Sequence, residues 1–145
     1  MEIHNLLLDE PKLAPLKYRV SAALIDFLIL WLLSFGMGYF FGDYVVNNDS
    51  MGYNITGWPG FFLFLIEVGL MPVQEGLTGR TIGKRVVQIK VVKEDYSNIS
   101  VSRSIARHFF DIVDLILLIG LLIAATTPKR QRIGDLVAKT VVVIG

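Results

Sequence analysis

Three long stretches that are almost free of charge dominate this sequence. The first covers residues 20–41, in which Asp26 is the charged side chain. A helix of this length spans about 33 Å, which is enough to cross the apolar interior of a bilayer. Residues 58–74 contain Glu67 as their charged residue, and residues 109–127 contain Asp111 and Asp114. Each stretch therefore predicts a hydrophobic helix long enough for a membrane.

The composition of the whole chain agrees with a membrane location. Of its 145 residues, 53% are hydrophobic and 19% are charged, whereas ordinary soluble domains are about 45–50% apolar and about 25% charged. So few polar residues cannot cover three apolar helices, which argues against a soluble all-α domain. The length suits one domain. We therefore expect a membrane all-α fold, a small bundle of three hydrophobic helices that forms a single domain over residues 1–145.

Charge and cysteine content exclude several functions. The 14 lysines and arginines nearly balance the 13 acidic residues, so the chain lacks the basic surface that nucleic-acid binding needs, and we expect no nucleic-acid partner. The chain has no cysteine, which excludes a thiol nucleophile, and its two histidines cannot build a metal site alone. No catalytic arrangement or cofactor motif is evident. We expect no enzymatic activity, no cofactor and no bound metal.

Basic residues are distributed unevenly around the predicted helices. The loop 42–57 contains no lysine or arginine, whereas residues 78–107 contain seven. Because cytoplasmic loops are enriched in these residues, we expect a multi-pass protein of the cell membrane with its N-terminus in the cytoplasm and the loop 42–57 outside. A full crossing by residues 109–127 would place a basic tail outside. Either the rule fails there or this helix is re-entrant near Gly120; we favour a cytoplasmic tail.

Two polar stretches carry the pattern of β-strands. Residues 84–92 and 136–144 are rich in β-branched side chains with partial alternation, as in half-buried strands. If they pair with each other, they form a short cytoplasmic β element and lie on one side of the membrane. The alternative is that each lies on the membrane interface separately.

Charged side chains inside the predicted helices are the main functional candidates. A carboxylate within a membrane is costly, so it is normally paired, protonated or exposed to water. Arg19 precedes Asp26 by seven residues and shares its helix face, and Arg107 precedes Asp111 by four. Three interpretations remain open: an ion or proton pathway, a buried ion-pair lattice that fixes helix packing, and a pocket for a lipid or a partner.

Several separated motifs together resemble the RDD family of small, mostly prokaryotic membrane proteins. In chain order they are residues 18–26, 78–85, 103–114, 127–135 and 138–142. The family name refers to one arginine and two aspartates; Arg19 and Asp26 match the first two, and we assign the second aspartate to Asp135, with Asp111 and Asp114 as competitors. The chain departs from the family pattern at residues 138–140, which read Ala-Lys-Thr where Ala-Gly-Thr is usual, so Lys139 takes the place of the glycine.

The resemblance implies a membrane protein of poorly defined function that is usually considered transport-related. We expect a transporter coupled to a monovalent cation or a proton, assembled as a homo-oligomer because three short helices cannot enclose a pathway, and in contact with anionic lipid headgroups. The alternative is a non-transporting assembly module or lipid-binding scaffold. The candidate pathway residues are Arg19, Asp26, Glu67, Arg107, Asp111, Asp114 and Asp135.

Overall fold

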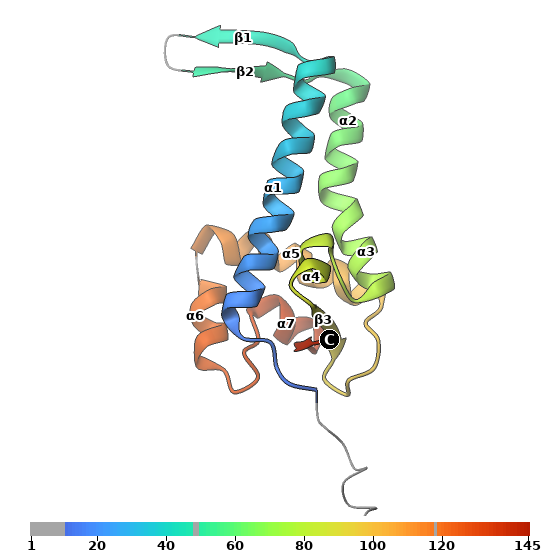
Figure 1. Ribbon diagram of the computed structural model, residues 1–145, viewed down its shortest axis with the longest axis vertical. Coiled ribbons are helices and arrows are strands. Elements are labelled where there is room, and N and C mark those ends of the chain that lie inside the picture. Colours follow the sequence, from blue (N-terminus) through green and yellow to red (C-terminus); the bar gives the residue numbers. More distant parts are fainter. Residues whose placement is uncertain (1–10, 48–49, 118) are drawn as a thin grey trace, which may run out of the picture.

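Two long helices stand side by side on a base of shorter helices and strands (Figure 1). The computed structural model describes residues 11–47, 50–117 and 119–145, with the side chains of Ser50 and residues 111–122 left undescribed. Helix α1 covers Leu16–Phe41. The second long helix runs antiparallel to it and consists of three consecutive segments, which are α2 (Gly57–Leu65), the π-helical turn η2 (Ile66–Leu70) and α3 (Met71–Thr78).

Both long helices have the length and apolar character of membrane spans. They contain 26 and 22 residues, and only 11% and 17% of their most apolar windows are buried within the protein. Apolar helices of a soluble core would be buried, so these surfaces suit contact with lipid. The first two predicted hydrophobic helices are confirmed as helices long and apolar enough to cross a membrane, at 16–41 and 57–78 in place of 20–41 and 58–74.

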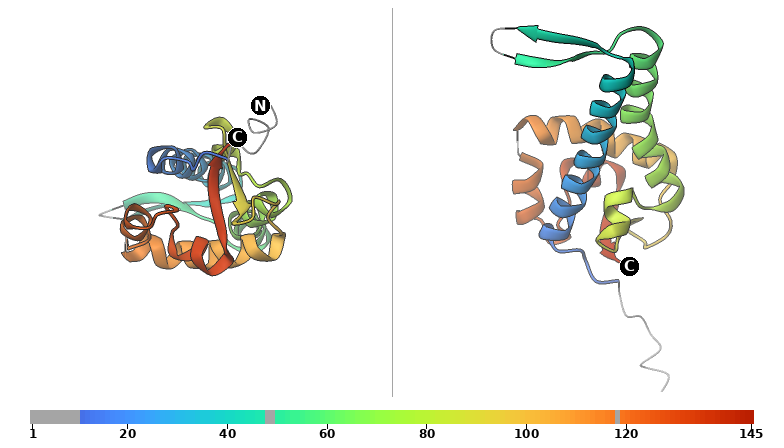
Figure 2. Two further views of the ribbon diagram at one scale, coloured as in Figure 1. Left: turned by 90° about the horizontal axis from the view of Figure 1, so that it is seen from below. Right: turned by 45° about the horizontal axis from the view of Figure 1, so that its top comes forward.

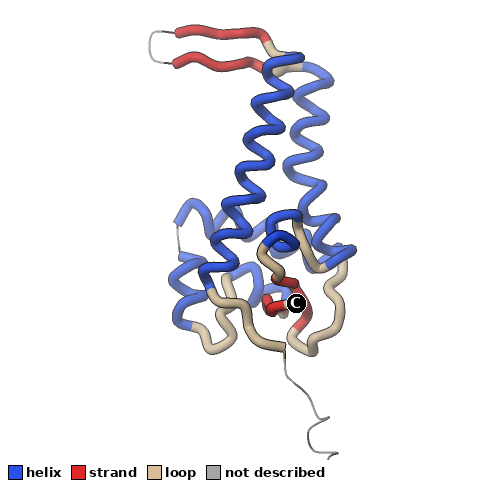
Figure 3. Tube along the Cα trace, viewed as in Figure 1, coloured by secondary structure: helices blue, strands red, loops and turns tan. Residues whose placement is uncertain are grey.

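A β-hairpin joins the two helices at the end away from the base (Figure 3). Strands β1 (Asp43–Asn47) and β2 (Ser50–Asn54) pair antiparallel, with Asp43 opposite Asn54. Tyr53 of β2 packs against Gly38 so closely that a Cβ there would lie 2.9 Å from the Cβ of Tyr53. The sequence reading did not foresee this hairpin.

The third hydrophobic stretch does not form a third helix parallel to the others. Of this stretch, residues 109–117 belong to α5 (Val101–Leu117) and residues 119–126 form α6 (Ile119–Thr126). Helix α5 crosses the base transversely, and α6 runs at an angle to it (Figures 1 and 2). The three-helix bundle is therefore not confirmed, and the proposed point of re-entry, Gly120, lies within α6. Buried polar side chains in the first half of α5, notably Ser104 and Arg107, explain why it stays at the base.

The base combines two short helices with a second two-stranded sheet. Helix α4 (Ile82–Val86) precedes β3 (Ile89–Lys93), and α7 (Ile133–Ala138) precedes β4 (Thr140–Ile144). The strands pair antiparallel from Ile89 opposite Ile144 to Lys93 opposite Thr140.

The predicted pairing of 84–92 with 136–144 is thus confirmed for their second halves, but the prediction of strand was wrong for residues 84–86 and 136–138, which are helical. The reason is that Gln88 and Lys139 adopt positive φ angles of 55° and 51°, which end each helix and turn the chain into the strand.

The core of the base brings both ends of the described chain together. Ile89, Val91 and Val142 are buried with Ala14 and Ala22. The backbone N–H of Ala14 donates to the carbonyl of Val142 at 2.8 Å. The segment before α1 and strand β4 therefore lie at the same end of the molecule.

Candidate functional site

A cluster of buried charges lies where the long helices meet the base. Its members come from α1, α3, α4, α5 and α7, so it links almost every helix of the base end. Glu75 and Asp135 are 0% and 1% exposed, and the side chain of Lys84, the most accessible member, is 16% exposed. We call this set the ionic cluster; its members are Arg19, Glu75, Lys84, Arg107 and Asp135.

Positive and negative groups alternate through the ionic cluster. Arg19 forms an ion pair with Asp135. Arg107 Nε donates to Asp135 Oδ1 at 2.8 Å, and Nη2 of Arg107 lies 2.7 Å from the same oxygen in an ion pair. Arg107 also forms an ion pair with Glu75. Glu75 in turn pairs with Lys84. Arg107 therefore bridges the two carboxylates, as the forked guanidinium geometry allows.

The electrostatics of Asp135 follow from this arrangement. Burial by itself raises the pKa of the Asp135 carboxyl, but Arg107 and Arg19 outweigh burial and hold that pKa well below its usual range. The backbone N–H of Arg132 adds a hydrogen bond at 3.1 Å. Asp135 is therefore ionised at neutral pH. Removing one partner of such a buried pair typically costs about 3–5 kcal/mol, because the other charge is left uncompensated.

Asp26 lies next to the ionic cluster but has different partners. Its Oδ1 accepts from the backbone N–H of Gly83 at 2.7 Å, and its Oδ2 accepts from Thr81 Oγ1 at 2.5 Å. Both donors belong to the start of α4, so the carboxylate fastens α4 to α1. A Cβ at Gly83 would collide with the carbonyl oxygen of Ala22, so glycine is needed for this close contact.

Glu67 lies apart from the ionic cluster, half-way along the second long helix. It belongs to the π-helical turn η2 and is exposed on the surface of the chain. Its Oε1 lies 2.6 Å from Ser34 Oγ on α1. The same hydroxyl lies 2.8 Å from the carbonyl oxygen of Leu30. Because a hydroxyl has one hydrogen, it cannot donate to both acceptors at once.

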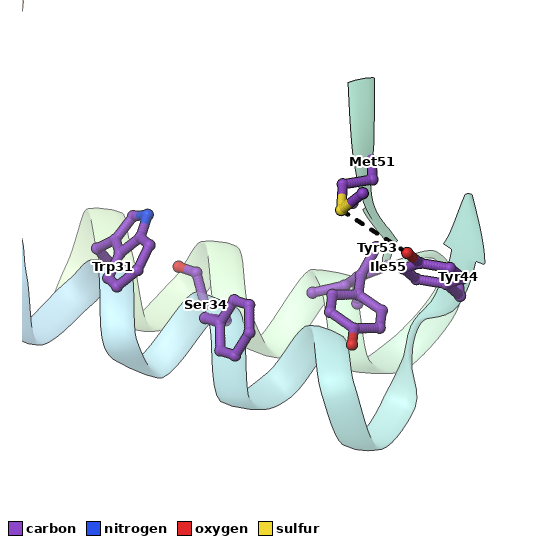
Figure 4. A pocket seen from close by; sticks show the side chains of 8 residues that line it. Trp31, Ser34, Tyr44, Met51, Tyr53 and Ile55 are labelled. Carbon is purple, nitrogen blue, oxygen red and sulfur yellow. Dashed lines mark hydrogen bonds between the residues drawn. The ribbon is translucent and has the colours of Figure 1, made fainter. Parts of the chain in front are cut away.

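Three cavities adjoin these polar groups. The hairpin cavity, of about 580 Å³, lies beneath β1 and β2, where Tyr44 donates a weak hydrogen bond to the Met51 sulfur at 3.8 Å (Figure 4). It is lined by Trp31, Ser34, Phe35, Tyr44, Met51, Gly52, Tyr53 and Ile55.

The two other cavities lie nearer the base and share Met71 and His108 in their walls. The Glu67 cavity, of about 280 Å³, is lined by Glu67, Val68, Met71, Pro72, Ile105, His108 and Phe109. The cluster cavity, of about 310 Å³, is lined by Arg19, Ala23, Asp26, Phe27, Leu30, Met71, Thr81, Lys84, Arg107, His108, Arg132 and Val142.

His108 stands between the Glu67 cavity and the ionic cluster. Its Nδ1 lies 2.9 Å from the carbonyl oxygen of Ser104 and 4.0 Å from Glu75 Oε1. A carbonyl oxygen only accepts, so we assign the ring hydrogen to Nδ1, which leaves Nε2 as the basic nitrogen. A proton taken up at Nε2 would make an imidazolium beside the Glu75 carboxylate.

The structure joins some of the predicted site residues and separates others. Arg19, Arg107 and Asp135 meet in the ionic cluster, and Asp26 shares the cluster cavity with the two arginines. Glu67 does not join them. The side chains of Asp111 and Asp114 lie outside the described residues.

Sequence reasoning missed Glu75 and the pairing of Lys84. Glu75 follows directly after the predicted second helix, and Lys84 was considered as part of the strand-like stretch 84–92. The signal that could have revealed this pair is the position of Glu75, an acidic residue at the boundary between an apolar helix and a basic segment. In the described part of the chain, no group of three or more metal-ligating side chains is arranged to hold a metal ion.

Comparison with known protein families matches residues 13–139 to the RDD family. No curated protein and no solved structure matches the chain. The family match covers well over half of the chain, including every member of the ionic cluster, both exposed apolar helices and Asp26. The chain therefore belongs to the RDD family and is a membrane protein.

Proposed function

We propose that this protein exchanges protons for monovalent cations across the membrane, with Glu67 as the carboxyl group that carries the proton at mid-membrane. The observation that carries this proposal is the position of Glu67. It lies in the middle of an apolar helix, touches Ser34 of the hairpin cavity and lines a second cavity together with His108. Ionisable residues at such depth are rare and commonly functional.

The surroundings of Glu67 support a group that gains and loses a proton. When Ser34 donates to the carbonyl of Leu30, a protonated Glu67 can donate to the Ser34 oxygen. When Glu67 is ionised, the hydroxyl can turn and donate to the carboxylate instead. π-helical turns such as η2 occur frequently at functional sites, and this one includes Glu67 in an otherwise α-helical span.

Neighbouring cavities supply a route on either side of Glu67. Ser34 lines the hairpin cavity. On the other side, Glu67 and His108 line one cavity, and His108 also lines the cluster cavity at the base. We assign His108 as the relay, because it lines both of these cavities. Arg19, Asp26, Arg107 and Asp135 shape the cavity at the base end of this route, and Asp111 and Asp114 stay predicted relays.

The proposal includes an orientation and an assembly. The base, with its many lysines and arginines, faces the cytoplasm, and the hairpin faces outside. Two spans cannot enclose a pathway, so a homo-oligomer in the bilayer provides its remaining wall. A second copy over the exposed carboxyl of Glu67 also removes an ionisable group from contact with lipid.

Liposomes containing the purified protein and a pH-sensitive dye test the proposal. A potassium or sodium gradient should drive a change of internal pH with wild-type protein. Glu67→Gln should reduce the rate by about tenfold or more, because the amide cannot carry a proton. Glu94→Gln is the matched control, since Glu94 is an exposed carboxylate of the base, and it should retain the wild-type rate.

Two results would contradict the proposal. Equal rates for the wild type and Glu67→Gln would exclude Glu67 as the carrier. A wild-type protein that is folded in the liposome and moves neither protons nor cations would favour the scaffold alternative, in which the ionic cluster only holds the helices together.

A further inference from the structure

The cluster cavity contains a cation whose charge the ionic cluster does not neutralise. Arg19, Lys84 and Arg107 are each paired with Glu75 or Asp135. Arg132 also lines the cavity, and no ion pair joins it to any described residue. Its Nε is a buried donor without a hydrogen-bond partner in the described structure. A buried donor of this kind is costly unless a ligand or water accepts from it.

The balance of charge around the cavity is positive. The four cations that line it face three nearby carboxylates, those of Glu75, Asp135 and Asp26. Only Asp26 lines the cavity, and both of its oxygens already accept hydrogen bonds from the start of α4. One positive charge is left over in this set, and Arg132 is the cation among the four that has no ion-pair partner among the described residues. His108, in the same wall, adds to this excess when protonated.

One wall of the cavity is apolar and runs along α1. Ala23, Phe27 and Leu30 follow one another at spacings of four and three residues, so they share one face of the helix. The exposed side chain of Phe27 lies on the part of α1 above the charged end. The cavity thus has a cationic floor and an apolar wall that leads along the membrane-spanning helix.

We propose that the cluster cavity binds the phosphate group of an anionic lipid, with Arg132 as its principal donor. A guanidinium matches the oxygens of a phosphate with two parallel hydrogen bonds. The apolar chain of the lipid would lie against Ala23, Phe27 and Leu30, which a free phosphate cannot use. The volume of about 310 Å³ falls within the range of small-molecule sites. This site does not depend on the transport proposed above.

Binding to the full-length protein in a neutral detergent tests the inference without any ion gradient. Phosphatidylglycerol is titrated as the anionic lipid, phosphatidylcholine as the zwitterionic lipid, and inorganic phosphate as the free anion. Phosphatidylglycerol should bind about tenfold more tightly than phosphatidylcholine. Arg132→Gln should weaken phosphatidylglycerol binding by about tenfold, whereas Arg85→Gln, an exposed arginine outside the cavity, should leave it unchanged.

A second variant tests the apolar wall and does not touch the charges. Phe27→Ala should weaken the binding of phosphatidylglycerol several-fold. The elution volume of this variant in size-exclusion chromatography and its helix content should stay those of the wild-type protein. Three results would overturn the inference: equal losses in Arg132→Gln and Arg85→Gln, phosphatidylcholine binding as tightly as phosphatidylglycerol, or inorganic phosphate binding through Arg132 with no preference for the lipid. The last result would assign the site to a free anion.

Discussion

Among single residues, Lys139 shows how a local conformation limits stability. It connects α7 to β4 with φ at 51°, a left-handed conformation in which a side chain is strained. Lys139→Gly should therefore stabilise the protein by about 1 kcal/mol. Thermal unfolding in detergent measures the effect. Lys139→Ala removes the same charge but keeps the Cβ, so it should give no comparable gain; equal gains in both variants would assign the effect to charge.

The ionisation of Asp135 predicts a dependence of stability on pH. Because the two arginines lower its pKa in the folded state, its contribution is fully present above about pH 4 and is lost as the pH falls further. The difference in unfolding midpoint between the wild type and Asp135→Asn should stay constant from pH 7 to 5 and shrink below about pH 4. Asp43→Asn, on the exposed hairpin, should show no large difference. A difference that shrinks between pH 7 and 5 would contradict this assignment.

The sequence identified single site residues better than their partners. Arg19 and Arg107 were recognised because charges near apolar helices are costly, whereas Asp135 was assigned only through the resemblance to the RDD family. Their pairing was not foreseen, since spacing along one helix only relates neighbours on that helix. Arg19 and Asp135 are separated by 116 positions and meet through the packing of the base. Glu75 was missed because it lies just outside the apolar stretch that defined the predicted helix.

At the scale of elements, the contact between α1 and α4 depends on Gly83. A Cβ added at Gly83 would collide with the carbonyl oxygen of Ala22, and the backbone N–H of Gly83 donates a hydrogen bond to Asp26. Gly83→Ala should therefore destabilise the fold by about 1–3 kcal/mol, measured as a lower unfolding midpoint. Gly36→Ala is the matched control, because a Cβ there meets nothing within 4 Å. If Gly36→Ala were as damaging as Gly83→Ala, the loss would reflect helix flexibility and not the α1–α4 contact.

Elements with a simple hydrophobic pattern were predicted well, and mixed ones were not. The two long apolar helices were foreseen from their residue types, and the pairing of β3 with β4 was one of the two arrangements that the sequence left open. Residues 109–127 passed the same length test, yet they divide between α5 and α6. The apolar stretch begins at residue 109 and so leaves out the polar first half of α5. The contacts of that polar half with α3 and α7 keep α5 at the base. The hairpin of β1 and β2 lies between two stretches with a strong hydrophobic helix pattern, and its own residues show no comparably clear strand pattern.

The whole molecule is polarised along the axis of its long helices. A base with paired charges and packed strands occupies one end, exposed apolar helices form the middle, and a hairpin forms the other end (Figure 1). The carboxyl of Glu67 lies in the apolar middle, and the surplus cation Arg132 lies in the base. Transport by the first and lipid binding by the second both require that the membrane is crossed twice, with the base on one side.

Cysteine labelling in intact cells tests this central claim most directly, because the native chain contains no cysteine. Asp43→Cys places a thiol on the hairpin and Lys139→Cys places one on the base, both at exposed positions. A membrane-impermeant maleimide should label position 43 in intact cells and position 139 only after the membrane is permeabilised. Labelling of position 139 in intact cells, or of both positions to the same extent, would contradict the account.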